Sequence, residues 1–328
     1  MNTEESERRS RLLSLKLRAL VRDHLGLIAD PEGSAEAFMP GAAFVTSDAV
    51  WVMIDGDAAR SLGGVLAWAP QFEKPIHLLV ERDSGIVARR AQLFDIDISV
   101  WHVDDRTLLP AVAEPQLISP AASDAHLAFV DLIESSGADA LVEHGVVVGE
   151  VRGLEMCRVV DDATTGEVRL EVGMGRHDRE AFAMVHGELP TEQAMRQVID
   201  AVLPHRYEGA DPHPFNSFGV ERLQRWRAMQ APTSIGFTRL SPADPPVLRT
   251  NVKDAVPCVA LGTTDSGVLA AAVFVHGVDL DVVPFAVDAA SRLGTSDVTI
   301  VVRRRDVVKP IERLANLAHI HVRFAFHS

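Results

Sequence analysis

Ionisable side chains are densest in two stretches near the middle of the chain, residues 143–160 and 169–182. Glu150, Glu155 and Glu171 stand there in runs rich in valine and leucine, which are typical of β-strands. Carboxylates on adjacent strands can share a hard divalent cation such as Mg²⁺ or Mn²⁺, and such an ion activates water for hydrolysis. We therefore take these two stretches as the first candidate for a functional site.

The pattern resembles that of the restriction-endonuclease-like, or PD-(D/E)xK, nuclease superfamily over about residues 122–182. In that superfamily a helix precedes a strand, a strand that carries an acid, and a strand that carries (D/E)xK. Glu155, in a Gly-Leu-Glu tripeptide, stands at the first acid, and Glu171, in a Leu-Glu-Val-Gly segment, stands at the second. Gly173 occupies the position of the lysine.

The resemblance implies a divergent metal-dependent phosphodiesterase in which Glu155 and Glu171 bind Mg²⁺ or Mn²⁺, with Glu150 as a further ligand. Because the lysine that orients the attacking water is missing, Arg176 or His177 would have to assist the water or the phosphate. This hypothesis predicts that the two strand carboxylates lie about 4 to 6 Å apart and face a cleft.

The same stretch also suits a protein without catalytic activity. Glutamates on the solvent faces of alternating strands would then form cross-strand ion pairs with neighbouring arginines. The residues of this interpretation are Glu143, Glu150, Glu155, Glu167 and Glu171 with Arg152, Arg158 and Arg169. The missing lysine favours this alternative, an interaction or scaffold protein that retains a nuclease-like fold and binds a protein partner or a second copy of itself.

A third alternative is a small-molecule binder or hydrolase that uses a crevice between repeated units. The glycines before Asp178 would let a phosphate approach the backbone, although Asp178 equally suits a local cap of the helix that follows. No Gly-rich segment is followed by Lys-Ser or Lys-Thr, and no GxGxxG joins a strand to a helix, so we expect no nucleotide cofactor. Cys157 and Cys258 lack metal-ligand spacing and are predicted to be buried thiols.

The elements that must position these acids belong to a middle α/β segment. Apolar periodicity predicts a helix over 122–135, strands near 141–148, 151–160 and 168–173, and helices near 179–185 and 191–203.

The two ends of the chain are predicted to carry the same ββαβαβ unit. Shifted by 222 positions, residues 57–103 align without gaps on residues 279–325, with matching strand and helix order. The expected fold class is therefore α/β, with duplicated end units around a middle segment of restriction-endonuclease-like topology. The predicted domains are an N-terminal helix and loop (1–40), a first repeat unit (41–108), the middle unit (120–205), a Pro-rich irregular connection (206–255) and a second repeat unit (256–328).

The composition of the chain limits the kinds of partner that we expect it to bind. The 328 residues are 47% hydrophobic with a formal net charge of -14, which is typical of a folded acidic protein and disfavours binding to a nucleic-acid backbone. The longest apolar run, Val268–Val275, is far shorter than the roughly 20 residues that a membrane span needs. We expect a cytoplasmic protein that does not enter a membrane.

Overall fold

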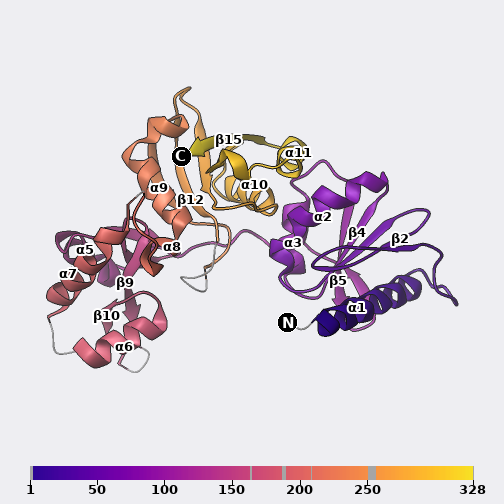
Figure 1. Cartoon of the computed structure of the whole chain (residues 1–328), viewed down its shortest axis with the longest axis horizontal. Helices are drawn as coiled ribbons and strands as arrows, with labels where there is room; N and C mark the ends of the chain where they lie inside the picture. The colour runs from indigo at the N-terminus through magenta and orange to yellow at the C-terminus, as the bar shows by residue number, and fades with distance from the viewer. Residues whose placement is uncertain (1–2, 163–164, 187–189, 208, 250–255, 328) are drawn as a thin grey trace. The chain divides into compact units, whose positions relative to one another are not determined.

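The computed structural model describes residues 3–162, 165–186, 190–207, 209–249 and 256–327 (Figure 1). In these residues the chain is a mixed α/β protein with three β-sheets, which confirms the predicted α/β class. It divides into two compact units, each assembled from separate stretches of the chain. The first unit comprises Met1–Gln116, Val278–Ser291 and Val307–Arg323, and the second comprises Leu117–Gly277, Arg292–Asp306 and Phe324–Ser328.

The first unit contains both strands and helices. They are α1 (Thr3–His24), β1 (Ser34–Glu36), β2 (Gly41–Val45), β3 (Val50–Ile54), η1 (Ala58–Arg60), α2 (Leu62–Trp68), η2 (Ala69–Phe72), β4 (Ile76–Val80), α3 (Ser84–Ala91), β5 (Ile98–Asp104), β6 (Thr107–Pro110), α10 (Val282–Arg292) and α11 (Lys309–Leu317). The six strands form one sheet in chain order. β2 and β3 are an antiparallel hairpin, whereas β3–β4 and β4–β5 are parallel pairs joined through helices, as parallel neighbours require.

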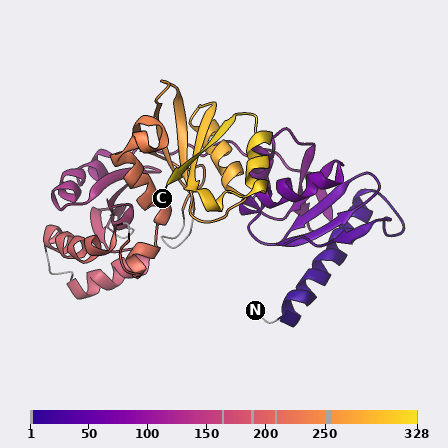
Figure 2. The ribbon, with the colours of Figure 1, turned by 45° about the horizontal axis from the view of Figure 1, so that its top comes forward.

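Helix α1 covers one face of this sheet, and its first turns extend past the sheet (Figure 2). Leu17, Leu20 and Val21 form its buried stripe, with the helical spacing that predicts a helix over residues 4–25. The stripe packs against Trp51 and other apolar residues of the central strands. Burial of this stripe, at about 25 cal/mol for each Å² of apolar surface, is what holds an otherwise charged helix on the sheet.

The sheet has two more strands than the sequence pattern predicts, β1 in the expected N-terminal loop and β6 at the other edge. Three prolines predict a linker over residues 104–120, but β6 forms within that range and pairs antiparallel with β5. β6 is the edge strand, and proline is tolerated at a sheet edge because the missing N–H faces no partner.

The second unit contains the other two sheets. Its elements are α4 (Asp124–Leu127), α5 (Val130–Ser135), β7 (Asp139–Glu143), β8 (Val146–Val151), β9 (Leu154–Asp161), β10 (Val168–Val172), α6 (Arg176–His186), α7 (Thr191–Val202), η3 (Leu203–His205), α8 (Pro214–Ser217), α9 (Val220–Gln230), η4 (Pro232–Ile235), β11 (Phe237–Ala243), β12 (Cys258–Thr264), β13 (Leu269–Phe274), β14 (Asp297–Arg303), η5 (Arg304–Asp306) and β15 (His321–His327).

The second sheet, of order β10-β9-β8-β7, is antiparallel throughout. Helices α5 and α7 cover one of its faces through Ile133, Met195 and Ile199. The sequence predicts two strands there, over 141–148 and 151–160, but the chain forms three. The predicted number of strands is therefore wrong. Two-residue turns at 144–145 and 152–153 interrupt the valine-rich run, and all four turn residues have the positive φ of type I′ hairpins.

The third sheet has the order β11-β12-β13-β14-β15. β12 and β13 are antiparallel, and β13 and β14 are parallel. β11 lies inside the stretch predicted to be irregular, residues 206–255, and pairs antiparallel with β12. The prolines of this stretch favoured the prediction of an irregular segment. β11 accommodates Pro242 because it is the edge strand of its sheet.

Helix α9 lies between the second and third sheets (Figure 1). Ala228 on this helix belongs to the same apolar cluster as Phe237 and Phe274 of the third sheet. Cys258 donates a hydrogen bond from Sγ to the Glu221 carbonyl at 3.3 Å. The helix therefore shares its apolar side with the third sheet and turns Arg222 and Arg225 toward the second.

Candidate functional site

The predicted acids lie on one face of the second sheet, opposite the face that α5 and α7 cover. Glu150 on β8 is the direct cross-strand partner of Glu155 on β9, and Glu171 on β10 is the partner of Arg158. A bulge beside Glu150 shifts the register, so Glu155 and Arg158 share a face although they are three residues apart. The structure thus brings the three predicted carboxylates onto one polar face.

Glu155 is 1% exposed and fully engaged by arginines. Arg158 donates from Nε and Nη2 to its two oxygens at 2.9 and 3.0 Å, and Arg249 donates to Oε2 at 2.7 Å. Burial by itself would raise the pKa of the Glu155 carboxyl, but the hydrogen bond and charge of Arg158 outweigh it and lower the pKa. Glu155 is therefore a buried, paired carboxylate.

Glu171 is held between two arginines. Arg169 donates from Nη2 to Oε1 at 2.8 Å, and Arg179 donates from Nε to Oε2 at 3.1 Å. The same Arg179 guanidinium places Nη1 3.7 Å from Oε1 of Glu155. A guanidinium cation thus contacts both of the carboxylates that were expected to share a metal ion.

This arrangement does not fit a shared divalent ion. Mg²⁺ and Mn²⁺ require several free oxygen ligands around one point. The lone pairs of Glu155 and Glu171 are directed at guanidinium groups instead, and among the residues that the structure describes no three His, Cys, Asp or Glu side chains gather as a metal-binding set.

Helix α9 supplies two further buried arginines to the polar face. Arg222 donates from Nη1 to Glu150 and from Nη2 to both oxygens of Glu143 at 2.6 Å. Arg225 donates from Nη2 to Glu150 at 3.2 Å. Burial raises the pKa of Glu143, but Arg222 outweighs burial and lowers that pKa to about 2. Glu150 is therefore a partner of α9, 3% exposed, rather than an open metal ligand.

His177, one of the two residues expected to assist the reaction, does not reach the two carboxylates. His177 has a side chain that is 98% exposed, with Nδ1 3.6 Å from Glu180 Oε2. Arg176 begins α6, but its side chain lies outside the described part of the structure. Asp178 does not precede the helix as a cap, because α6 begins at Arg176; it lies in the first turn and accepts a hydrogen bond from the Met174 N–H at 2.6 Å.

Gly173 has a structural reason to be glycine rather than lysine. Its φ is +135°, and a Cβ there would lie 2.9 Å from the Arg179 backbone nitrogen. A lysine at this position would push away the segment that carries the Arg179 guanidinium. Glycine at position 173 therefore goes together with the close approach of the segment that carries Arg179.

Comparison with protein-family models, curated proteins and solved structures finds no match. Within the described part of the chain, every helix is too short or too polar to traverse a lipid bilayer.

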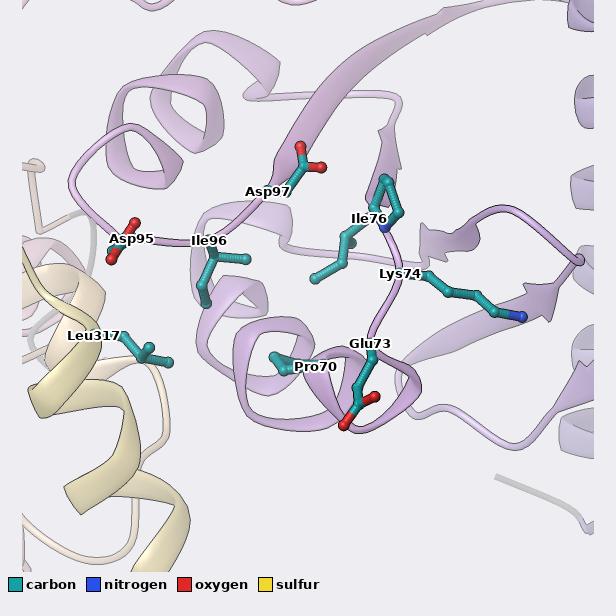
Figure 3. A pocket seen from close by; sticks show the side chains of 9 residues that line it. Pro70, Glu73, Lys74, Ile76, Asp95, Ile96, Asp97 and Leu317 are labelled. Atoms are coloured by element: carbon teal, nitrogen blue, oxygen red, sulfur yellow. The ribbon is translucent and has the colours of Figure 1, made fainter.

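A hollow of about 360 Å³ lies in the first unit beside the start of β4. Figure 3 shows Ile76, Ile96 and Leu317 turned toward this hollow, while the Lys74 ammonium and the Asp97 carboxylate turn away from it. Apolar walls with charges at the rim offer contact surface without a reactive group. We therefore do not take this hollow as a catalytic site.

The arginine partners of the acids are the part of the site that sequence reasoning missed. Arg222 and Arg225 lie 72 and 75 residues from Glu150 along the chain, and Arg249 lies 94 residues from Glu155. A short helix with two arginines three residues apart is normally interpreted as a solvated face. The strand that follows it, β11, is largely exposed, so the neighbouring sequence gives no signal that α9 is buried.

Proposed function

We propose that this chain is a non-catalytic interaction protein whose middle segment keeps a nuclease-like arrangement of acids with arginine in place of metal and lysine. The observation that carries this proposal is the Arg179 guanidinium, which contacts both Glu155 and Glu171. Catalysis by a metal would need an open coordination position for water. Glu155 is 1% exposed and accepts three arginine hydrogen bonds, which argues against such a position.

The proposal includes duplicated end units that act as a scaffold. The first and third sheets each contain an antiparallel hairpin whose second strand pairs in parallel with the next, β2-β3-β4 in one and β12-β13-β14 in the other. This common order supports duplication. The partner is a protein or a second copy of this chain, because a net charge of -14 repels a phosphate backbone.

A cytoplasmic location is part of the same proposal. Cys157 and Cys258 are both buried free thiols. Burial raises the pKa of each thiol to about 12, so neither is a reactive thiolate at neutral pH. Free thiols of this kind suit a reducing compartment.

The proposal is tested by titrating the protein with Mn²⁺ and Mg²⁺ while thermal unfolding and cleavage of linear DNA and RNA are followed. We expect neither ion to change the Tm of the wild type specifically, and we expect no cleavage. Glu171→Ala should lower the Tm equally with and without metal, because Arg169 and Arg179 lose their shared partner.

Glu192→Ala is the matched control, since its carboxylate makes an exposed ion pair with Arg196 that contributes at most about 1 kcal/mol. A rise in the wild-type Tm with Mn²⁺ that disappears in Glu171→Ala but persists in Glu192→Ala would support the phosphodiesterase hypothesis instead.

A further inference from the structure

One face of α1 carries two exposed leucines beside two arginines. Leu12 and Leu15 are 56% and 58% exposed, and Arg8 and Arg11 precede them by four residues each. Because an α-helix has about 3.6 residues per turn, the four side chains form one continuous patch, which lies opposite the buried stripe of this helix. All four are exposed, and the first turns of α1 extend past the sheet (Figure 2). We call Arg8, Arg11, Leu12 and Leu15 the α1 patch.

The arginines of the α1 patch differ from the other basic residues of the helix. Within the part of the chain that the structure describes, Arg8 and Arg11 form no ion pair. Three other basic residues pair with acids of the same unit: Arg9 with Asp55, Lys16 with Glu81, and Arg18 with Asp30. Two uncompensated cations beside exposed leucines suit a partner surface that is both apolar and acidic.

The hollow of about 360 Å³ beside β4 has apolar walls, with Ile76, Ile96 and Leu317 turned toward it (Figure 3). It belongs to the same compact unit as α1. Walls of this kind accept aliphatic side chains, because contact with them removes apolar surface from water. The hollow is therefore suited to the leucines of the α1 patch.

The rim of this hollow is negatively charged. Its acids, which we call the acidic rim, are Glu73, Asp95 and Asp97, and all three are exposed. None of these carboxylates forms an ion pair with a residue that the structure describes. The Lys74 ammonium does not neutralise them, because it donates a hydrogen bond to the Thr46 carbonyl at 2.6 Å and turns away from the hollow (Figure 3). The rim therefore complements the arginines of the α1 patch.

We propose that the α1 patch of one chain docks into this hollow on a second copy of the chain. Leu12 and Leu15 enter the apolar space, while Arg8 and Arg11 pair with the acidic rim. Each copy carries both halves of the contact, so two copies suffice to form it. The inference rests on the proposed interaction function and names the partner in it.

The net charge of -14 opposes this association at long range. At physiological ionic strength the Debye length is about 8 Å, so repulsion between the bulk of the two copies is largely screened. Opposite charges in direct contact beside an apolar surface are screened much less. Local complementarity therefore outweighs the overall repulsion under these conditions, which are the conditions for the test.

The test is sedimentation of the full chain at concentrations up to about 0.1 mM, at which an association with a micromolar Kd is nearly complete. We expect the wild type to self-associate. Arg8→Glu/Arg11→Glu and Glu73→Lys/Asp95→Lys should each associate at least about tenfold more weakly, because like charges then face each other. Both variants should keep the wild-type Tm, since the four residues are exposed.

Matched controls change the net charge equally at exposed positions elsewhere. Arg82→Glu/Arg239→Glu and Asp104→Lys/Asp105→Lys should associate like the wild type. Asp105 also matches Glu73 in having a positive φ, 52° against 53°. Leu12→Ser/Leu15→Ser leaves every charge in place and should weaken association at least about tenfold, so it replaces the arginine variant if that variant does not fold.

An equimolar mixture of the two charge-reversed variants should associate again, because the intact α1 patch of one meets the intact hollow of the other. A chain with all four charge reversals should also recover self-association, since both sides of the contact have changed sign.

Unchanged association in both charge-reversed variants, or no association in their mixture, would overturn the proposal. A wild type that stays monomeric would overturn it too, without deciding the interaction function, which the Mn²⁺ titration tests separately.

Discussion

The guanidinium of Arg179 changes the chemistry of the site more than any other single group. It contacts the two carboxylates that a nuclease-like site would give to a metal. Each acid keeps its predicted place on a strand, and its charge is neutralised by arginine rather than by a cation from solution. The acids could be found from the sequence because strand periodicity is local, whereas their arginine partners come from distant segments.

Arg222 gives the sharpest prediction at the scale of a residue. Arg222→Met would leave Glu143 and Glu150 buried with weaker pairing, and should lower the free energy of unfolding by about 3–5 kcal/mol. The pKa of Glu143 is lowered from 4.5 to about 2, so the stability that it contributes is complete above pH 4.5 and is lost as the pH falls through about 2. The variant should lose less stability over this acid range. Urea unfolding at several pH values measures both effects.

Arg196→Met is the control for this variant, because Arg196 is exposed and pairs with Glu192 one turn earlier in the same helix. Its unfolding free energy should stay within about 0.5 kcal/mol of the wild type. Equal losses in the two arginine variants would contradict a buried pairing role for Arg222.

At the scale of an element, the hairpin between β8 and β9 positions the acid pair. Arg206 lies beneath this turn, fully buried, and donates hydrogen bonds to the carbonyls of Arg152, Phe215, Phe218 and Gly219. Burial lowers the pKa of Arg206 to about 10, yet the guanidinium stays charged at neutral pH. The Arg206 side chain therefore links the turn by hydrogen bonds to the segment that leads into α9.

Substituting alanine for Gly153 in this turn is expected to lower the stability of the protein strongly. Gly153 has a φ of +81°, and a Cβ would lie 2.4 Å from the Arg222 carbonyl carbon, so Gly153→Ala should cost several kcal/mol. Gly166 has a similar φ of +73°, and a Cβ there would have no described atom within 4 Å, so Gly166→Ala should cost only about 1–2 kcal/mol. Urea denaturation followed by circular dichroism compares the two.

Both variants strain the backbone, but only Gly153→Ala also creates a steric clash with α9. The difference between their losses of unfolding free energy therefore measures the effect of that clash. Equal costs for the two glycine variants would show that the β8–β9 turn does not pack on the α9 backbone as described.

At the scale of the whole molecule, the first unit takes segments from both ends of the chain. Asp288 on α10 is completely buried and pairs with Arg89 and Arg90, almost 200 residues earlier in the sequence. Gln116 also donates to the same carboxylate at 2.7 Å. Burial raises the pKa of Asp288, but the hydrogen bond of Arg89 and the charge of Arg90 outweigh it and lower the pKa.

Asp288→Asn should therefore destabilise the protein by about 3–5 kcal/mol, because two arginines would share a neutral amide in a buried position. Asp265→Asn, in an exposed turn, serves as the control and should leave stability within about 0.5 kcal/mol. Thermal and urea unfolding measure both. A neutral outcome for Asp288→Asn would mean that the C-terminal segment is not required for the stability of the first unit.

The sequence by itself determined the α/β class, the order of most helices and strands, and the strand positions of Glu155 and Glu171, whereas Glu150 falls between two predicted strands and lies on β8 in the structure. These features depend on hydrophobic periodicity and chain-local turns, which act over a few residues. The strands β6 and β11 were missed because proline is tolerated at sheet edges, and edges exist only once strands have paired.

Only the tertiary structure decided what the acids do. Which cation neutralises a buried carboxylate depends on side chains that folding brings from distant segments, and Arg179, Arg222 and Arg249 reach the acids through helix and loop packing.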